Sequence, residues 1–76
     1  MIYLSRRQPD LNVSRFYALH LQFDLFGPVS VVKEWGRIGS PGTVRHELYD
    51  DERAAMASMQ KRTDGKIKRG YSRHDH

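Results

Sequence analysis

The alternation of apolar and polar residues along the chain predicts four β-strands followed by one helix. Residues 16–23 give the clearest strand, because apolar side chains recur there at every second position. Residues 29–38 carry apolar side chains on both faces, which is typical of a central strand or of one whose second face is also used. A short first strand begins at Ile2 and ends before Pro9, and residues 43–49 form the last predicted strand.

Glycine and proline mark the connections between these strands. Gly27-Pro28 predicts a turn between the second and third strands. Ser40-Pro41-Gly42 predicts a type II turn, because proline supplies a φ of about −65° and the following glycine supplies a positive φ. The strands on either side of this second turn would form a hairpin.

The segment after residue 49 predicts a helix that opens on the acidic run Asp50-Asp51-Glu52. Acidic side chains at a first turn supply an N-cap and complement the helix dipole. Ala55, Met56 and Met59 recur at helical spacing, so we expect them to form the buried stripe.

The end of this helix has two possible positions in the sequence. Asp64-Gly65 weakens the helix, which either stops there or extends to about Arg69. Gly70 then suits a C-cap, and Tyr71 is expected to fold back onto the sheet.

Together these elements predict an α+β fold: a small antiparallel β-sheet of about four strands with one C-terminal α-helix packed on one face. The sheet surface expected beneath the helix is apolar and comprises Tyr17, Leu19, Leu21, Val32, Ile38, Val44 and Leu48. This arrangement would leave Trp35 and Arg37 on the face away from the helix, or at its rim.

Length and composition narrow the class of protein. The chain has 76 residues and no cysteine, which predicts one domain over residues 1–76 without disulfides. It contains no apolar stretch long enough to span a membrane and no signal-peptide pattern at its start. We therefore expect a cytoplasmic protein without a membrane partner.

The net charge of +4 lies entirely in the last part of the chain. Residues 1–60 carry seven basic and seven acidic side chains, whereas residues 61–76 carry the whole excess. The basic residues of this end are Lys61, Arg62, Lys66, Lys68, Arg69 and Arg73. Such a run indicates either a solvated helix face and tail or a patch that follows phosphates.

The run Trp35-Gly36-Arg37 places the only tryptophan two residues from an arginine at the end of a predicted strand. Strand side chains alternate, so Trp35 and Arg37 share a face, and Gly36 lets another backbone or a ligand approach closely. An aromatic ring beside a guanidinium suits a nucleotide, since one stacks and the other meets phosphate. A core tryptophan next to a surface arginine would show the same spacing.

The residues do not favour catalysis. The histidines lack metal-ligand spacing on a predicted helix, and His20 and His46 are expected on faces of the sheet. The acidic run at the helix start suits capping, and no glycine-rich phosphate loop precedes a helix. We expect no enzyme activity, no cofactor, no metal site and no small-molecule substrate.

An ordered set of features resembles the WGR domain, a module of DNA-dependent poly(ADP-ribose) polymerases and of bacterial proteins. In chain order the set is Phe16-Tyr17, Trp35-Gly36-Arg37-Ile38-Gly39, Gly42, the helix with Ala54 and Ala55, the basic end and Gly70-Tyr71. The resemblance covers about residues 15–72. Residues 1–14 are expected to add an edge strand and a loop, and residues 73–76 a disordered tail.

The resemblance implies a non-catalytic part of a DNA-break sensor, in which the signature tryptophan packs against a sugar and basic residues contact phosphates. Carried to this chain, it implies stacking by Trp35 and a phosphate or partner contact by Arg37, with Gly36 between them. Charge alone adds further candidates: Lys33, Arg45, Lys61, Arg62, Lys66, Lys68 and Arg69.

Two functional hypotheses follow. In the first, the chain binds DNA or RNA and prefers ends, nicks or single-stranded segments. In the second, the Trp35/Arg37 surface is a protein-interaction hot spot whose partner is another protein or a second copy of this chain.

Overall fold

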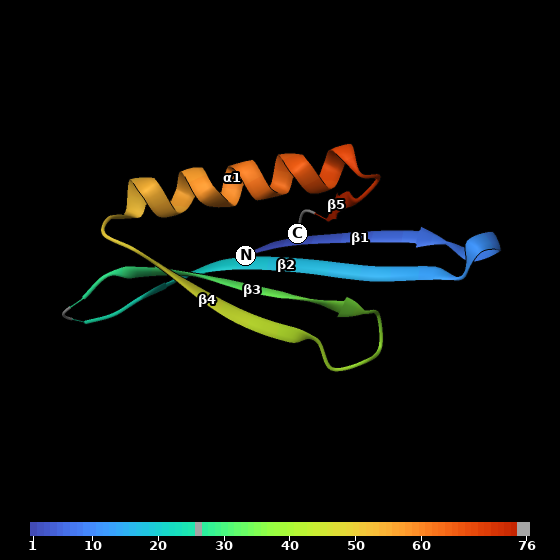
Figure 1. Cartoon of the computed structure of the whole chain (residues 1–76), viewed down its shortest axis with the longest axis horizontal. Helices are drawn as coiled ribbons and strands as arrows, with labels where there is room; N and C mark the ends of the chain where they lie inside the picture. The colour runs from blue at the N-terminus through green and yellow to red at the C-terminus, as the bar shows by residue number, and fades with distance from the viewer. Residues whose placement is uncertain (26, 75–76) are drawn as a thin grey trace.

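The chain folds into a five-stranded antiparallel sheet with one helix lying across one face (Figure 1). The structure is a computed structural model and describes residues 1–25 and 27–74. Its elements are β1 (Ile2–Gln8), a short 3₁₀ helix (Pro9–Leu11), β2 (Val13–Phe23), β3 (Val29–Arg37), β4 (Thr43–Tyr49), α1 (Glu52–Lys68) and β5 (Ser72–His74). The predicted α+β class is confirmed.

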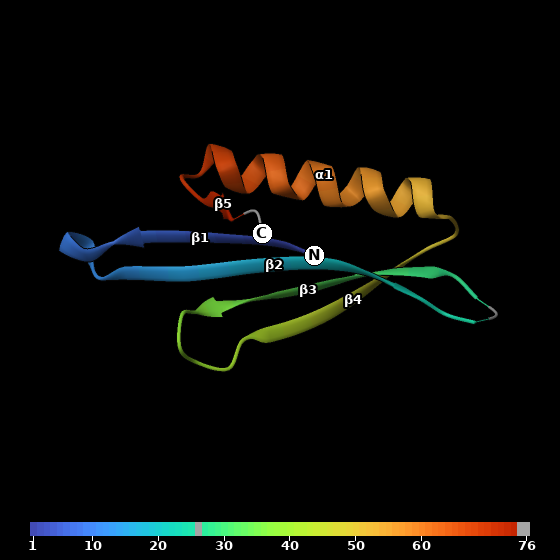
Figure 2. The same ribbon diagram turned by 180° about the vertical axis from the view of Figure 1, so that it is seen from behind.

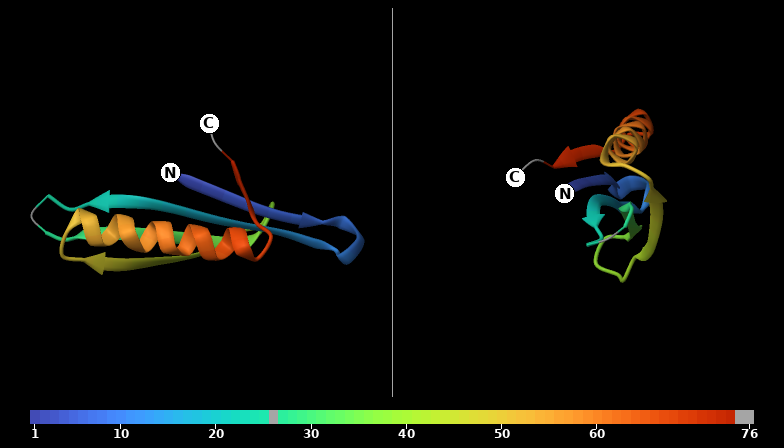
Figure 3. Two further views of the ribbon diagram at one scale, coloured as in Figure 1. Left: turned by 90° about the horizontal axis from the view of Figure 1, so that it is seen from above. Right: turned by 90° about the vertical axis from the view of Figure 1, so that its left-hand side faces the viewer.

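The strand order is β4-β3-β2-β1-β5, so β4 and β5 form the two edges of the sheet (Figures 1 and 2). β3 lies inside the sheet, in agreement with the first of the two expectations for residues 29–38, because it pairs with β2 on one side and β4 on the other. The helix runs along β2, β3 and β4, as the view from above shows (Figure 3). No helix in the described part of the chain is long and apolar enough to span a membrane.

The fifth strand is a correction to the sequence analysis. Ser72–His74 pair with β1, where a disordered tail was expected from residue 73. The strand has three exposed polar residues and therefore no apolar alternation to reveal it. It also removes β1 from the edge position expected for the first strand. The expected tail at residues 75–76 lies outside the described residues.

The hydrophobic core lies between α1 and the sheet. Its buried members are Leu4, Tyr17, Leu19, Val29, Val31 and Ala55. Tyr17 and Leu19, expected beneath the helix, are confirmed there, and Leu21 packs against this cluster from a partly buried position.

The residues of β3 and β4 that were expected in this core lie on the opposite face of the sheet. Val31 is fully buried in the core, so alternation directs its neighbour Val32 to the opposite face. Val44 and Leu48 lie on that opposite face as well and are 51% and 67% exposed. Ile38 follows the end of β3. Apolar residues on both faces of these strands left the register undecided in the sequence.

The helix begins and ends at positions that the sequence indicated. The Asp51 side chain accepts a hydrogen bond from the Ala54 amide at 2.7 Å, which caps the first turn. The helix passes through Gly65, so the longer of the two predicted ends is confirmed. Met56 is 54% exposed and does not belong to the buried stripe, whereas Ala55 and Met59 do.

A Schellman motif closes the helix and returns the chain to the sheet. Gly70 has a φ of +94°, the Gly70 amide donates to Ile67 O at 3.0 Å, and the Tyr71 amide donates to Lys66 O at 3.1 Å. Tyr71 then packs against the core cluster, as predicted.

The turn between β3 and β4 differs from the expected one. Positive φ falls on Gly39, at +88°, and the Ser40 amide donates to Arg37 O at 3.1 Å. Gly42 is required for a different reason, close packing. A Cβ at Gly42 would lie 2.8 Å from Phe16 Cζ and 2.8 Å from Trp35 O.

We expect Gly42→Ala to destabilise the fold by about 1–3 kcal/mol, because the added methyl would overlap backbone and a buried ring. Gly65→Ala is the matched control. It sits inside α1 with no atom within 4 Å of the added Cβ, so it should stabilise the chain by about 0.5–1 kcal/mol. Urea unfolding followed by Trp35 fluorescence measures both. Equal effects of the two substitutions would contradict the packing role of Gly42.

Candidate functional site

Trp35 lies on the helix-side face of the sheet, at the margin of the core. Its cross-strand partner is Tyr17, and the two rings stack with centroids 6.4 Å apart and planes 28° apart. The expected placement on the face away from the helix is wrong, while the alternative placement at a rim agrees with its partial burial. One side of the indole is therefore occupied by packing against the chain itself.

Gly36 allows a close approach, and the approaching group is the chain's own backbone. A Cβ at Gly36 would lie 3.1 Å from Gly42 Cα and 3.5 Å from Phe16 Cε1. This contact lies on the face opposite Trp35. The glycine of the motif thus holds the turn after β3 against Phe16 and fixes the strand that carries Trp35.

Arg37 ends β3 and is tied to the connection between β1 and β2. Its Nη1 donates to the carbonyl oxygen of Asn12 at 3.3 Å, and its Nη2 donates to Asn12 Oδ1 at 3.1 Å. Asn12 has a φ of +53°, which asparagine tolerates. Across the strands Arg37 lies opposite Arg15, a like-charge pair that is unfavourable without an anion nearby.

Lys66 projects from the last turns of α1 into the same region. Its ammonium lies 4.6 Å from the ring centroid of Tyr17 and 5.2 Å from that of Tyr71. Burial lowers the pKa of Lys66 below its ordinary value, and the positive charges of Arg69 and Arg15 lower it further. No carboxylate in the described part of the chain forms an ion pair with Lys66, Arg15 or Arg69.

These side chains surround a hollow of about 260 Å³ that we call the Trp35 hollow. Its lining residues are Arg15, Phe16, Trp35, Gly36, Arg37, Lys66 and Tyr71. The lining combines three cationic side chains with three aromatic ones and includes no acidic residue. Such a lining suits a single phosphate group and an adjacent ring or sugar.

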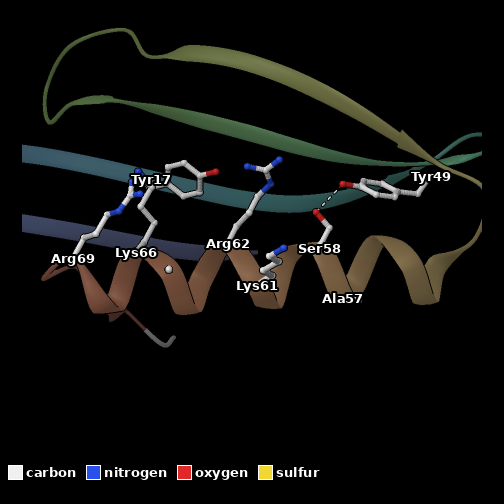
Figure 4. A pocket seen from close by; sticks show the side chains of 9 residues that line it. Tyr17, Tyr49, Ala57, Ser58, Lys61, Arg62, Lys66 and Arg69 are labelled. Carbon is white, nitrogen blue, oxygen red and sulfur yellow. Dashed lines mark hydrogen bonds between the residues drawn. The ribbon is translucent and has the colours of Figure 1, made fainter.

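A larger groove of about 630 Å³ lies between α1 and the sheet (Figure 4). Lys66 and Arg62 reach from the helix towards Tyr17 on β2, and the Tyr49 hydroxyl donates to Ser58 Oγ at 2.7 Å. Lys66 lines both the groove and the Trp35 hollow, so the two lie next to each other.

The charges in the middle of this groove are neutralised within the chain. Glu47 lies 2.7 Å from Arg62 Nη2 and 3.3 Å from Lys33 Nζ. Burial lowers the pKa of Arg62, but the negative charge of Glu47 and the Tyr17 hydroxyl outweigh this and raise it overall. Burial also raises the pKa of Tyr17. This end of the groove is therefore a poorer anion site than the Trp35 hollow.

The structure brings some of the expected site residues together and separates others. Trp35, Gly36, Arg37 and Lys66 meet at the hollow, and Arg69 lies next to them in the groove. Lys33 and Arg62 share the helix side of the sheet but are paired with Glu47. The others are further away: Arg45 lies opposite Lys33 on β4, Lys61 borders the groove, and Lys68 lies on an outer helix face with Asp64.

Arg15, Tyr17 and Tyr71 contribute to the site, and the sequence analysis did not include them as binding residues. Arg15 and Tyr17 come beside Arg37 and Trp35 only through the pairing of β2 with β3. One pattern in the sequence could have indicated Arg15 and Tyr17: they are two positions apart, as Trp35 and Arg37 are. Within the described residues no group of three metal-ligating side chains comes together.

The fold and the Trp35 hollow define a small α+β module with a basic, aromatic recess. Residues 1–76 match the WGR domain, and the chain belongs to this family, whose members serve as nucleic-acid-binding modules in poly(ADP-ribose) polymerase-like proteins. The match includes residues 1–14, which the resemblance in the sequence left out.

The chain is also similar to the uncharacterized protein y4dW of Sinorhizobium fredii (strain NBRC 101917 / NGR234). The two are 33% identical over 70 residues, which cover 92% of this chain and 34% of that protein. This chain therefore spans about a third of the length of the curated relative it matches. No solved structure shows significant similarity to the chain.

We expect Lys66→Met to change the free energy of unfolding at pH 7 by less than about 1 kcal/mol, since the loss of the contacts with Tyr17 and Tyr71 is offset by removal of a partly buried charge. If Lys66 mainly stabilised the fold, its replacement would lower the free energy of unfolding by more than this amount. Urea unfolding, with Lys68→Met as an exposed control, measures the difference.

The lowered pKa of Lys66 also has a pH signature. The folded chain binds fewer protons at this site than the unfolded chain, so this group's contribution to stability rises as pH passes upward through the folded pKa towards the ordinary value of 10.5. The stability of the wild type relative to Lys66→Met should therefore increase as the pH rises through the alkaline range towards 10.5. A difference that stays constant over this range would contradict the lowered pKa.

Proposed function

We propose that this chain is a non-catalytic nucleic-acid-binding module that recognises DNA ends, nicks or single-stranded segments. The observation that carries the proposal is the Trp35 hollow, in which Arg15 and Lys66 lie beside an indole without an acidic partner among the described residues. Under this hypothesis Arg15 and Lys66 contact phosphate oxygens, and Trp35 stacks on an exposed base or ribose.

The charges in the hollow support an anionic ligand. Arg15 faces Arg37 across the strands, and Lys66 is added from the helix, so three positive charges converge from three elements. The repulsion between these like charges is unfavourable in the free chain, and a bound phosphate would reduce it. By contrast, Glu47 already relieves the charges of Arg62 and Lys33.

The size of the hollow supports a preference for ends and single strands. At about 260 Å³ it is smaller than the sites that hold drug-sized ligands, which begin at roughly 300 Å³. It therefore suits one phosphate with part of a nucleoside. Tyr17 stacks on Trp35, and the Lys33 ammonium lies 5.7 Å from the centroid of the same ring. The remaining indole surface therefore suits a terminal or unstacked unit better than a base inside a stacked duplex.

The alternative, a protein-interaction hot spot at Trp35 and Arg37, has less support at this surface. Arg37 is already bonded to Asn12, and three cationic side chains line the hollow beside Trp35. Hot spots of protein interfaces are centred in desolvated pockets with few uncompensated charges.

The proposal is tested by fluorescence anisotropy with a labelled duplex that carries a 5′-phosphorylated end, competed by the same sequence within a closed circle. We expect Lys66→Gln to weaken binding and to reduce the slope of log affinity against log salt by about 1. Lys68→Gln removes the same charge from the same helix on its outer face and should leave both quantities nearly unchanged.

A second variant tests stacking. Trp35→Leu keeps an apolar contact with Tyr17 but removes the aromatic surface, so we expect a loss of about 1–3 kcal/mol of binding free energy together with loss of preference for the open end. Equal binding of open and closed DNA by the wild type would contradict end recognition. Equal effects of Lys66→Gln and Lys68→Gln would reduce the basic end to a nonspecific charge patch.

A further inference from the structure

The outer edge of β4 has no partner in the described structure. β4 is the last strand of the sheet and pairs only with β3 over its seven residues, Thr43–Tyr49 (Figure 1). At the other edge, β5 covers β1 over three residues. A strand edge of this length without a partner presents a row of backbone donors and acceptors that can pair with another strand.

The side chains of β4 are complementary to a second copy of the same strand. In an antiparallel pair centred on His46, Arg45 lies opposite Glu47 of the second copy, and Glu47 lies opposite Arg45 of that copy. Val44 likewise lies opposite Leu48 of the second copy. Centring the pair on Arg45 or on Glu47 would instead place like charges face to face.

The exposure of these residues agrees with a missing partner. Val44 and Leu48 are 51% and 67% exposed although both are large and apolar. They lie on the sheet face opposite α1. Pairing Val44 with Leu48 of a second copy would remove part of this apolar surface from water.

The charges on the helix side of β4 also favour a second copy of the chain as the partner of this edge. Arg45 lies opposite Lys33 within the chain, a like-charge pair, and has no carboxylate partner among the described residues. Glu47 already contacts Lys33 and Arg62, but its side chain remains 34% exposed. A carboxylate has about four acceptor positions, so Glu47 can also accept from Arg45 of a second copy.

We propose that two copies of this chain form a symmetric dimer by antiparallel pairing of their β4 strands, with the two-fold axis at His46. The interface is isologous, since each copy contributes the same strand. The axis runs perpendicular to the sheet, so both helices and both Trp35 hollows lie on one side of a continuous ten-stranded sheet. This inference does not depend on nucleic-acid binding.

Cysteine substitution tests both the dimer and its register, because the chain has no native cysteine. In the proposed pair the two residues 46 lie opposite each other with Cα atoms about 4.5–5.5 Å apart, which a disulfide can bridge. We expect His46→Cys to form a crosslinked dimer under mild oxidation, doubling the mass of 8.9 kDa on non-reducing gels.

Val44→Cys is the matched control, since it lies on the same strand and the same face. In the proposed register two residues 44 are four positions apart, about 14 Å, and should not crosslink to each other. Mixing Val44→Cys with Leu48→Cys should instead give a heterodimeric crosslink. Sedimentation equilibrium of the unmodified chain should show a mass that rises towards the dimer with concentration.

His46→Lys places two ammonium groups on the axis at an exposed position, and should shift this equilibrium to the monomer without unfolding the chain. Three results would overturn the proposal. They are a monomer at all concentrations, crosslinking of Val44→Cys with itself as fast as that of His46→Cys, and a dimer that His46→Lys does not weaken.

Discussion

The pairing of β2 with β3 is the constraint on which the site depends. It sets Tyr17 against Trp35 and Arg15 against Arg37, and all four share the helix side because side chains alternate along a strand. A slip of β3 by one residue would move Trp35 and Arg37 to the opposite face and bring Val32 beneath the helix. Gly36 and Gly42 help to hold this register, because their contact and the ring of Phe16 fix the end of β3.

The helix completes the site by adding the positive charge of Lys66 to a hollow that no acidic side chain lines. Lys66 lies over Tyr17 and near Arg15, and the Schellman motif turns the chain so that Tyr71 also contacts Lys66. Four residues earlier, Arg62 meets Glu47 and is neutralised. The same helix face thus carries one cation that serves the fold and one that lacks an acidic partner among the described residues, and this difference locates the candidate phosphate contact.

The sequence predicted the parts of this structure that depend on local chemistry. The α+β class, an N-cap within Asp50-Asp51-Glu52, Gly70 as a C-cap for the longer of two possible helices and the return of Tyr71 all follow from propensities and capping rules. It could not predict which face of β3 meets the helix, because both faces are apolar. It also could not place Arg15 in the site, since that requires the cross-strand register, or detect β5, which is short and polar.

The Trp35 hollow is the proposed nucleic-acid site, and one titration tests it. The most direct measurement is a titration of ¹⁵N-labelled chain with a short 5′-phosphorylated duplex, followed by NMR. The chain has one tryptophan, so its indole Nε1–H gives a single unambiguous signal. We predict that this signal shifts together with the amides of residues 15–17 and 66–71. Shifts confined to the outer face of α1 around Lys68, with the indole unchanged, would contradict the claim.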